Sequence, residues 1–263
     1  MSTAELKAKA KGALAGKWGK SALMILCYLL ITATISFVLG LIPVVGNIIS
    51  LIISLPISYG LIASFMRLRR GEAVSATDFL NSGLSNIGKV WGVYGHTLLK
   101  LLVPTIIAIV CMLVVTFSTA ASFTAGIMSG SSIRTAGFSG IAIIAYIGFI
   151  VAIIFSGTKG LLYSLTNYIL FDNPNMSSKA IVEESERLMR GNRWNYVWLS
   201  LTFIGWIILS FFTFYIGLLW VIPYILITNI FFYEALSGNT QNVNPIEGAT
   251  NIDPISTDDG PIS

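Results

Sequence analysis

Few side chains in this sequence are suited to acid–base, nucleophilic or metal chemistry. His96 is the single histidine, and the two cysteines are Cys27 and Cys111. A zinc site needs several His or Cys ligands at short spacing, and a serine triad needs a histidine held by a carboxylate. Neither pattern is present. We therefore expect a protein that is not an enzyme and holds no metal or cofactor, with both cysteines packing as small apolar side chains.

The densest group of charged side chains lies in residues 177–194, SSKAIVEESERLMRGNRW. Its paired glutamates with Arg187 resemble the arrangement of some intramembrane proteases, but the spacing is one residue too short. On a helix, Glu183 with Arg187 and Glu186 with Arg190 form favourable i,i+4 ion pairs. Apolar residues fall on the opposite face, serines precede the segment and a glycine follows its last turn. The pattern predicts an amphipathic helix, not an active centre.

A transporter needs polar side chains near the middle of the membrane, and these are sparse. The best candidates for a polar pathway are Asn167, beyond the fourth apolar segment, and Asn229 with Tyr224, in the last one. Their simpler interpretation is hydrogen bonding between helices. Glu234 ends the last segment, where it should reach water. Ionisable groups inside a membrane are costly and usually functional, so their scarcity argues against an ion-coupled pump.

The composition is that of an integral membrane protein. Hydrophobic residues make up 55% of the chain and charged residues only 11%, whereas about 25% charged is usual in soluble proteins. Charged residues and histidine are missing from residues 21–66, 101–133, 135–158 and 194–233. The first and last intervals are long enough to fold back as two spans each, since a span needs about 20 residues. The predicted spans are 21–41, 46–66, 98–118, 139–158, 197–214 and 218–236.

These spans form three hairpins, and a short amphipathic segment precedes each one. Every such segment ends in glycine, then one or two residues that include a basic one, and then tryptophan, which favours a turn from the membrane surface into the membrane. We predict that Trp18, Trp91, Arg193 and Trp194 are interfacial anchors and that the segments bind anionic headgroups. The fold class is therefore all-α: about six transmembrane helices as three hairpins, each preceded by a cytoplasmic interfacial amphipathic helix.

The basic residues predict the orientation of the chain. Of the 16 Lys and Arg residues, Arg134 alone lies on the opposite side of the predicted membrane from the others. By the positive-inside rule the basic side is cytoplasmic. We expect a multi-pass protein of the cell membrane with both termini in the cytoplasm. Residues 1–236 form the membrane domain, and residues 237–263, with four acids and no base, form a disordered cytoplasmic tail.

Several motifs carry a resemblance to a known family. They are residues 5–19 (ELKAKAKGALAGKWG), 185–191 (SERLMRG), 201–206 (LTFIGW), 217–224 (GLLWVIPY) and 232–234 (FYE). Together they resemble a family of bacterial integral membrane proteins, common in Gram-positive species and classed as a domain of unknown function. The resemblance implies a multi-span bacterial membrane protein and brings no established reaction.

Two functional hypotheses follow. The first is a non-enzymatic membrane protein that acts in envelope homeostasis or protection through lipid or protein interaction. Its partners would be anionic membrane lipid at the cytoplasmic face and, as a further candidate, another membrane protein; no nucleic-acid partner is expected. The alternative is a carrier or exporter of a small or lipidic substrate, which six spans and prolines within the spans would favour.

Overall fold

The computed structural model describes residues 2–42, 44–128 and 140–238, and in this part all regular structure is helical. Six helices are long and apolar enough to cross a membrane, which confirms the predicted fold class. Arg134 and the predicted acidic tail from residue 239 onward lie outside the described residues. The helices are α1 (Thr3–Leu14), α2 (Trp18–Gly40), α3 (Val45–Arg69), α4 (Asp78–Leu84), α5 (Ile87–Met128), α6 (Gly140–Gly160), the 3-10 turn η2 (Leu161–Tyr163), α7 (Thr166–Asp172), α8 (Ser178–Met189), α9 (Arg193–Phe212) and α10 (Leu218–Ser237).

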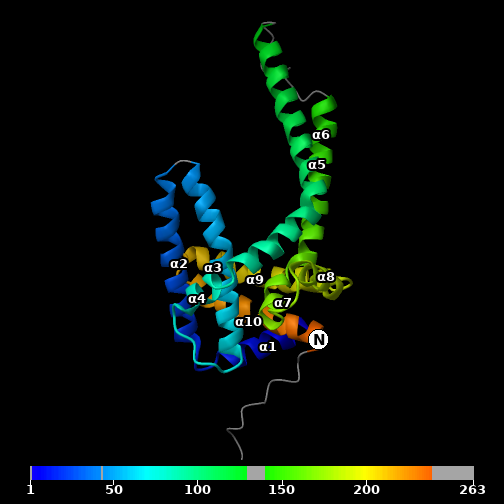
Figure 1. Ribbon diagram of the computed structural model, residues 1–263. Coiled ribbons are helices and arrows are strands. Elements are labelled where there is room, and N and C mark those ends of the chain that lie inside the picture. Colours follow the sequence, from blue (N-terminus) through cyan, green and yellow to red (C-terminus); the bar gives the residue numbers. More distant parts are fainter. Residues whose placement is uncertain (1, 43, 129–139, 239–263) are drawn as a thin grey trace, which may run out of the picture.

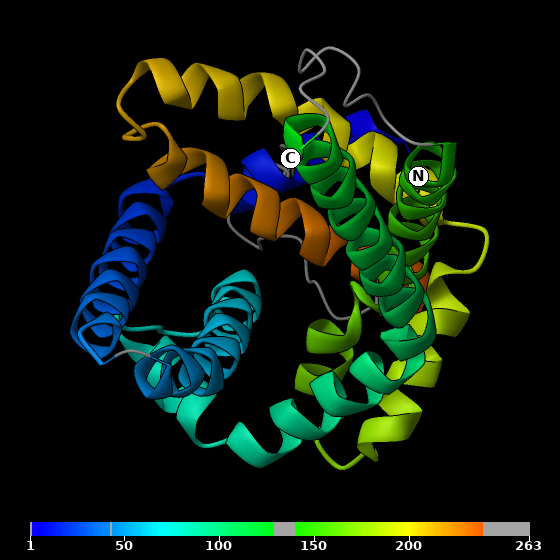
Figure 2. The ribbon, with the colours of Figure 1, turned by 90° about the horizontal axis from the view of Figure 1, so that it is seen from above.

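The long helices pair as three hairpins: α2–α3 is the first, α5–α6 the second and α9–α10 the third. The first and second hairpins rise from a common base and stand apart above it (Figure 1). Helix α5 runs across the base before it turns upward, and Pro104 interrupts its hydrogen bonding. It is helical well before and after the predicted span 98–118. Seen from above, α9 and α10 lie lengthwise across the view, so the third hairpin is strongly inclined to the first (Figure 2).

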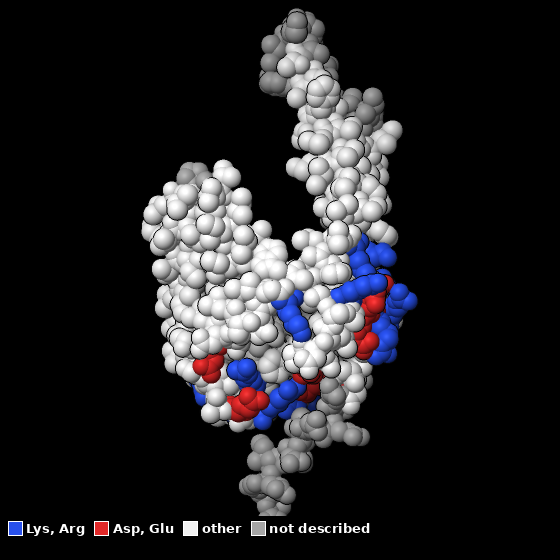
Figure 3. Space-filling model, viewed as in Figure 1, with Lys and Arg blue, Asp and Glu red and all other residues white. Residues whose placement is uncertain are grey.

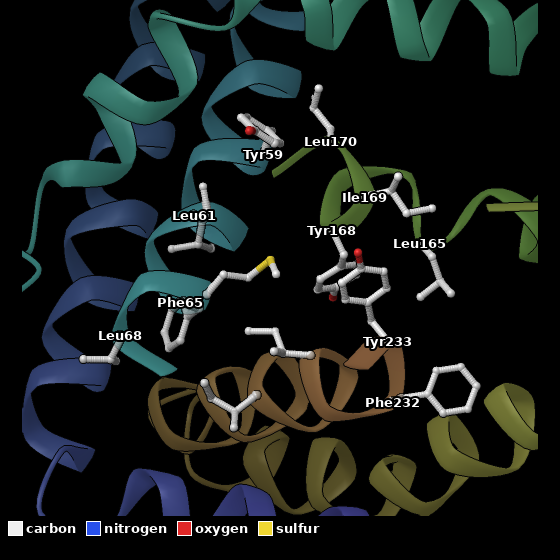
Figure 4. Close-up of a cluster of buried hydrophobic side chains, with 14 of the residues drawn as sticks. Tyr59, Leu61, Phe65, Leu68, Leu165, Tyr168, Ile169, Leu170, Phe232 and Tyr233 are labelled. Atoms are coloured by element: carbon white, nitrogen blue, oxygen red, sulfur yellow. The ribbon is translucent and has the colours of Figure 1, made fainter. Parts of the chain in front are cut away.

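The core of the molecule lies where the lower part of α3 meets α7 and α10. Figure 4 shows side chains from these three helices pointing toward one another, among them Phe65, Ile169 and Tyr233. All three are almost completely buried. The upper parts of α5 and α6 pack mainly on each other and leave most of their apolar side chains exposed. The second hairpin therefore contributes little to this core.

The sequence signals for helix ends are confirmed. Ser2 Oγ accepts a hydrogen bond from the Glu5 backbone N–H at 3.3 Å, and the Glu5 carboxylate accepts one from the Ser2 N–H at 2.9 Å. Ser177 Oγ caps α8 by accepting a hydrogen bond from the Ala180 backbone N–H at 3.3 Å. Gly191, which follows α8, has φ +85°, a left-handed conformation that glycine adopts without strain.

The amphipathic helices differ from the expectation in what covers their apolar faces. In α1, Leu6, Ala10 and Leu14 are buried, and the helix packs along α10. The apolar face of α8 is likewise buried, against α5, α7 and η2. Protein, not the membrane surface, therefore holds these helices, because the inclined third hairpin and the lower part of α5 provide apolar surfaces beside them.

Helix α4 lies beside the middle of α3 rather than at its basic end. Gly60 and Gly83 permit this approach, since a Cβ on Gly60 would lie 1.9 Å from the Phe79 carbonyl oxygen and one on Gly83 2.3 Å from that of Pro56. Small residues allow membrane helices to pack with their backbones close together. The first hairpin and α4 thus form one tightly packed unit.

Charged side chains gather at the base of the molecule. Figure 3 shows Lys, Arg, Asp and Glu around the lower part, while the described residues in the upper parts of the first and second hairpins show none on the visible face. On α8 the pairing differs from the prediction: Arg187 pairs with Glu184 at 2.6 Å, and Glu183 lies 3.9 Å from Lys179. The predicted pair of Glu186 with Arg190 is present at 2.9 Å.

Candidate functional site: a basic base with a buried ionic network

The base contains an ion pair that the sequence analysis missed. Arg69, the last residue of α3, pairs with Glu234 of α10 at 3.0 Å, and their side chains are only 6% and 9% exposed. The guanidinium also lies over the Phe231 ring, 4.3 Å from its centroid. Glu234 therefore does not reach water as expected. Arg69 and Glu234 are distant in the sequence, so no spacing pattern predicts that they pair.

A second pair extends this network to α7. Arg70 pairs with Asp172, which also accepts a hydrogen bond from the Tyr233 hydroxyl at 3.0 Å. The Tyr233 ring stacks on Tyr168 with centroids 5.7 Å apart, as Figure 4 shows. Helices α3, α7 and α10 are thus joined by charge, hydrogen bonding and ring contact. Because a buried ion pair is costly unless both partners are present, the network fixes how these three helices meet.

The predicted polar pathway residues lie in three different environments. The Asn167 amide donates to the Tyr94 hydroxyl at 3.3 Å, while Asn229 of α10 lies near Tyr168 of α7. Tyr224 packs between aromatic rings of α2 and α9. Asn167 therefore makes a hydrogen bond between helices, as the simpler interpretation requires, whereas Tyr224 makes ring contacts with neighbouring helices. A pathway through them stays a prediction.

Among the predicted anchors, Trp91 makes an unexpected bond. Its indole N–H donates to the Ile52 carbonyl oxygen of α3 at 3.1 Å. That carbonyl would normally accept from the backbone N–H of residue 56, which is Pro56 and has none. Trp91 therefore satisfies an acceptor that the proline leaves open, and it ties the start of α5 to α3.

Of the other three predicted anchors, Trp194 alone is exposed. Trp194 is 70% exposed, consistent with a position among headgroups, whereas Trp18 is half-buried and packs against Tyr224. Arg193 is half-buried and has no ion-pair partner among residues 2–42, 44–128 and 140–238. Whether these side chains anchor the protein in a bilayer stays a prediction.

Glu186 connects α8 to the second hairpin. Its carboxylate lies 2.8 Å from Lys100 Nζ of α5 and 2.9 Å from Arg190 Nη2. The hydrogen bonds from Lys100 and then Arg190 lower the pKa of Glu186 to about 2. The pKa of Glu184 is also lowered, by its hydrogen bonds with Arg187. Glu184 and Glu186 are therefore held in their charged form by the cations beside them.

The described residues carry more cations than their acids can pair. Each of the eight described carboxylates either forms an ion pair or accepts a hydrogen bond from a backbone N–H. Several cations in the same part of the chain have no ion-pair partner within 4.0 Å. They are Lys7, Lys9, Lys11, Lys17, Lys20, Lys89, Lys159 and Arg193. The base is therefore a surface with unneutralised positive charge beneath hairpins whose described upper parts are uncharged.

A hollow of about 520 Å³ lies in this base between the first turn of α1, the start of α9 and the end of α10. Ser2, Asn192 and Asn195 give it a polar side, and Trp198 and Leu236 an apolar one. No group of three His, Cys, Asp or Glu side chains suited to a metal comes together within the described ranges. The arrangement is suited to binding through charge and apolar contact.

Comparison with known proteins identifies a family. A family model described as a protein of unknown function (DUF975) matches residues 1–240. Comparisons with curated proteins and with solved structures give no match.

Proposed function

The chain belongs to the DUF975 family of proteins of unknown function, and we propose that it is a non-enzymatic protein of the cell membrane that binds anionic lipid at its basic end. The observation that carries the proposal is the excess of cations without an ion-pair partner beneath the uncharged hairpins. A basic residue near an anionic membrane surface contributes about 1 kcal/mol of binding energy.

The cations that best fit this role lie on α1 and at the start of α2. Lys9, Lys11 and Lys20 are exposed, and none has a carboxylate within 4.0 Å in the described part of the chain. The buried face of α1 fixes the helix on α10, so its lysines project from a rigid support. A preorganised set of charges loses less conformational entropy when it binds a lipid surface.

The proposed orientation puts the basic end in the cytoplasm. It is supported by the distribution of Lys and Arg, and by the start of α1 and the end of α10 lying together at that end (Figure 1). A topology reporter fused at Ser129 should read extracytoplasmic, and one fused at Gly248 cytoplasmic. The reverse readings would contradict the proposed orientation.

The physiological role that fits such a protein is envelope homeostasis or protection, through lipid or a second membrane protein. The exposed apolar side chains of the second hairpin support this role, since they offer a large surface to either partner. Co-purification from native membranes tests which partner is present. A stoichiometric protein partner would add to the lipid proposal, and the lipid measurement below is independent of it.

Lipid retention tests the proposal directly. The protein would be extracted from vesicles of equal phosphatidylcholine and phosphatidylglycerol content, and its bound lipids quantified by mass spectrometry. We expect enrichment of phosphatidylglycerol, reduced several-fold by the triple variant Lys9→Gln, Lys11→Gln, Lys20→Gln. The matched control replaces Lys179, Arg187 and Arg190 by Gln, because these cations are equally exposed but paired with carboxylates. No enrichment, or an equal loss in both variants, would contradict the proposal.

A carrier or exporter of a small or lipidic substrate is the second candidate. It is supported by the separation of the first and second hairpins above the base, which gives them room to move relative to each other (Figure 3). Flux of a labelled lipid or solute across vesicles containing the protein tests it. Flux that Asn167→Leu or Asn229→Leu abolishes would favour the carrier over the purely binding role.

A further inference from the structure

Helix α9 contacts the charged N-terminal helix halfway along its length. The Lys7 ammonium donates to the Thr202 carbonyl oxygen at 3.3 Å and lies 4.6 Å from the Phe203 ring centroid. On the same helix Lys9 and Lys11 are exposed. A lysine at the centre of a bilayer costs about 2.5–3.5 kcal/mol, so α1 belongs in water or among headgroups. The middle of α9 must therefore lie at the edge of the membrane.

Helix α10 is held at the same level. Tyr224 packs against Trp18, the first residue of α2, with ring centroids 6.4 Å apart, and against Phe203 at 5.2 Å. Trp18 directly follows Lys17, whose ammonium donates to the Leu68 carbonyl oxygen near the basic end of α3. These contacts place Tyr224 beside the point where the first hairpin enters the membrane.

The lengths that remain beyond these contacts are short. Helix α9 ends at Phe212, nine residues past Phe203, which is about 14 Å at 1.5 Å per residue. Helix α10 begins at Leu218, six residues before Tyr224, or about 9 Å. A hydrocarbon core is about 30 Å thick. The turn of the third hairpin therefore lies no more than about halfway across, and in Figure 1 it is level with the middle of α2 and α3.

The turn itself has the chemistry of a segment that lies in lipid. Every backbone N–H from Thr213 to Leu218 donates within the turn, including that of Gly217 to the Thr213 hydroxyl at 3.1 Å. Backbone groups in hydrocarbon must be satisfied in this way. No charged residue is present, and large apolar side chains point outward. These are Phe211, Phe212, Phe214, Tyr215 and Ile216, all between 59% and 89% exposed.

The backbone of this turn is strained. Phe214 and Tyr215 have φ of +51° and +64°, a left-handed conformation that costs about 1–2 kcal/mol for a residue with a side chain. In return the turn closes on itself: the Tyr215 N–H reaches the Ser210 carbonyl oxygen at 2.9 Å.

We propose that the third hairpin is re-entrant: it enters the bilayer from the basic side, places the turn at residues 211–216 among acyl chains and returns to the same side. The first and second hairpins then provide four crossings, and both termini stay on one side. The predicted spans 197–214 and 218–236 have the length and composition to cross, but their contacts with α1 and α2 limit their depth.

Cysteine accessibility tests this proposal. The background would carry Cys27→Ser and Cys111→Ser, and one cysteine would be introduced at a time, by Ile216→Cys or by the control Leu41→Cys. A membrane-impermeant maleimide would be added outside sealed, right-side-out vesicles that contain each variant. Leu41, at the tip of the first hairpin, is 70% exposed and should be labelled. We expect at least tenfold slower labelling of Ile216→Cys. Equal labelling of the two sites would overturn the proposal.

A spin label on the same two cysteines separates membrane depth from misfolding. At Ile216→Cys we expect high accessibility to oxygen, which partitions into hydrocarbon, and low accessibility to a water-soluble nickel chelate. At Leu41→Cys the chelate should gain access. Chelate accessibility at Ile216→Cys equal to that at Leu41→Cys would place the turn in water and refute a re-entrant hairpin, while leaving the lipid-binding proposal untouched.

Discussion

The second and third hairpins have similar apolar sequences but different surroundings. In the apolar windows of α5 and of α6 only 6% of residues are buried inside the protein, against 17% for α9 and 44% for α10. The second hairpin rises away from the base, whereas the third lies across it (Figures 1 and 2). A long uncharged run therefore does not by itself determine whether a helix faces lipid or protein.

Neighbouring charged and aromatic residues make the difference. The third hairpin has Arg69 at its Glu234 end and the rings and lysines of α1 and α2 along its middle. The second hairpin is joined to the rest mainly near its lower end, through Trp91 and Lys100. Breaking these contacts one at a time should therefore affect the two hairpins differently.

The largest effect is expected from Arg69→Met. It leaves Glu234 buried without its cation, and loss of one partner of a buried pair costs about 3–5 kcal/mol. The folded fraction in detergent, measured by size-exclusion chromatography and thermal melting, should fall sharply. Adding Glu234→Leu should recover much of the loss. Arg67→Met is the control, because its pair with Glu72 is exposed and 4.0 Å long; an equal loss there would argue against the network.

The next largest difference between the hairpins is expected in the stability cost of truncating an apolar side chain. Ile227→Ala in α10 removes a side chain that is 1% exposed, and such changes cost about 2–5 kcal/mol. Ile154→Ala in α6 removes one that is 61% exposed and should alter the melting temperature little. Similar losses for the two variants would mean that the second hairpin is packed against something comparable to a protein core.

The bond between Trp91 and α3 should give a smaller effect. Trp91→Phe leaves the Ile52 carbonyl unpaired, which costs about 1–3 kcal/mol. In a Pro56→Ala background the new backbone N–H can serve that carbonyl, so the same substitution should cost clearly less. A double-mutant cycle on thermal stability measures the difference. Additive effects would show that the indole does not replace the missing donor.

The smallest effect is expected from protonation of Glu186. Because its pKa is lowered to about 2, its ion pairs stabilise the contact of α8 with α5 above its ordinary pKa, near 4.5, and this stability is lost as pH falls toward 2. Hydrogen exchange of α8 should rise over that window. Glu186→Gln should show the faster exchange already at neutral pH, whereas Glu183→Gln, with an exposed partner, should not.

The sequence was sufficient for the six long helices and several helix ends, but not for the full length of α5, for α7 or for the neighbours of each helix. Uncharged intervals, capping serines and glycines after helices are local signals, and the helices, the Ser2 cap and the Gly191 stop follow them. The pair of Arg69 with Glu234 joins segments that are distant in the sequence, so no periodic pattern of residues predicts it. The same is true of the inclination of the third hairpin, which depends on contacts of α1. Trp91 shows the limit of local signals. Its motif predicted an interfacial anchor, but its indole donates to the Ile52 carbonyl oxygen, which lacks a backbone donor because residue 56 is proline.

Labelling by a photoactivatable phospholipid tests most directly whether the second hairpin faces lipid and the third is held by protein. A diazirine on the acyl chain would react with whatever side chains it meets, and mass spectrometry would locate the adducts by helix. We expect heavy labelling of α5 and α6, labelling of the turn at residues 211–216, and little on α10 beyond Tyr224. Labelling of α10 along its whole length, as heavy as that of α5, would contradict this account.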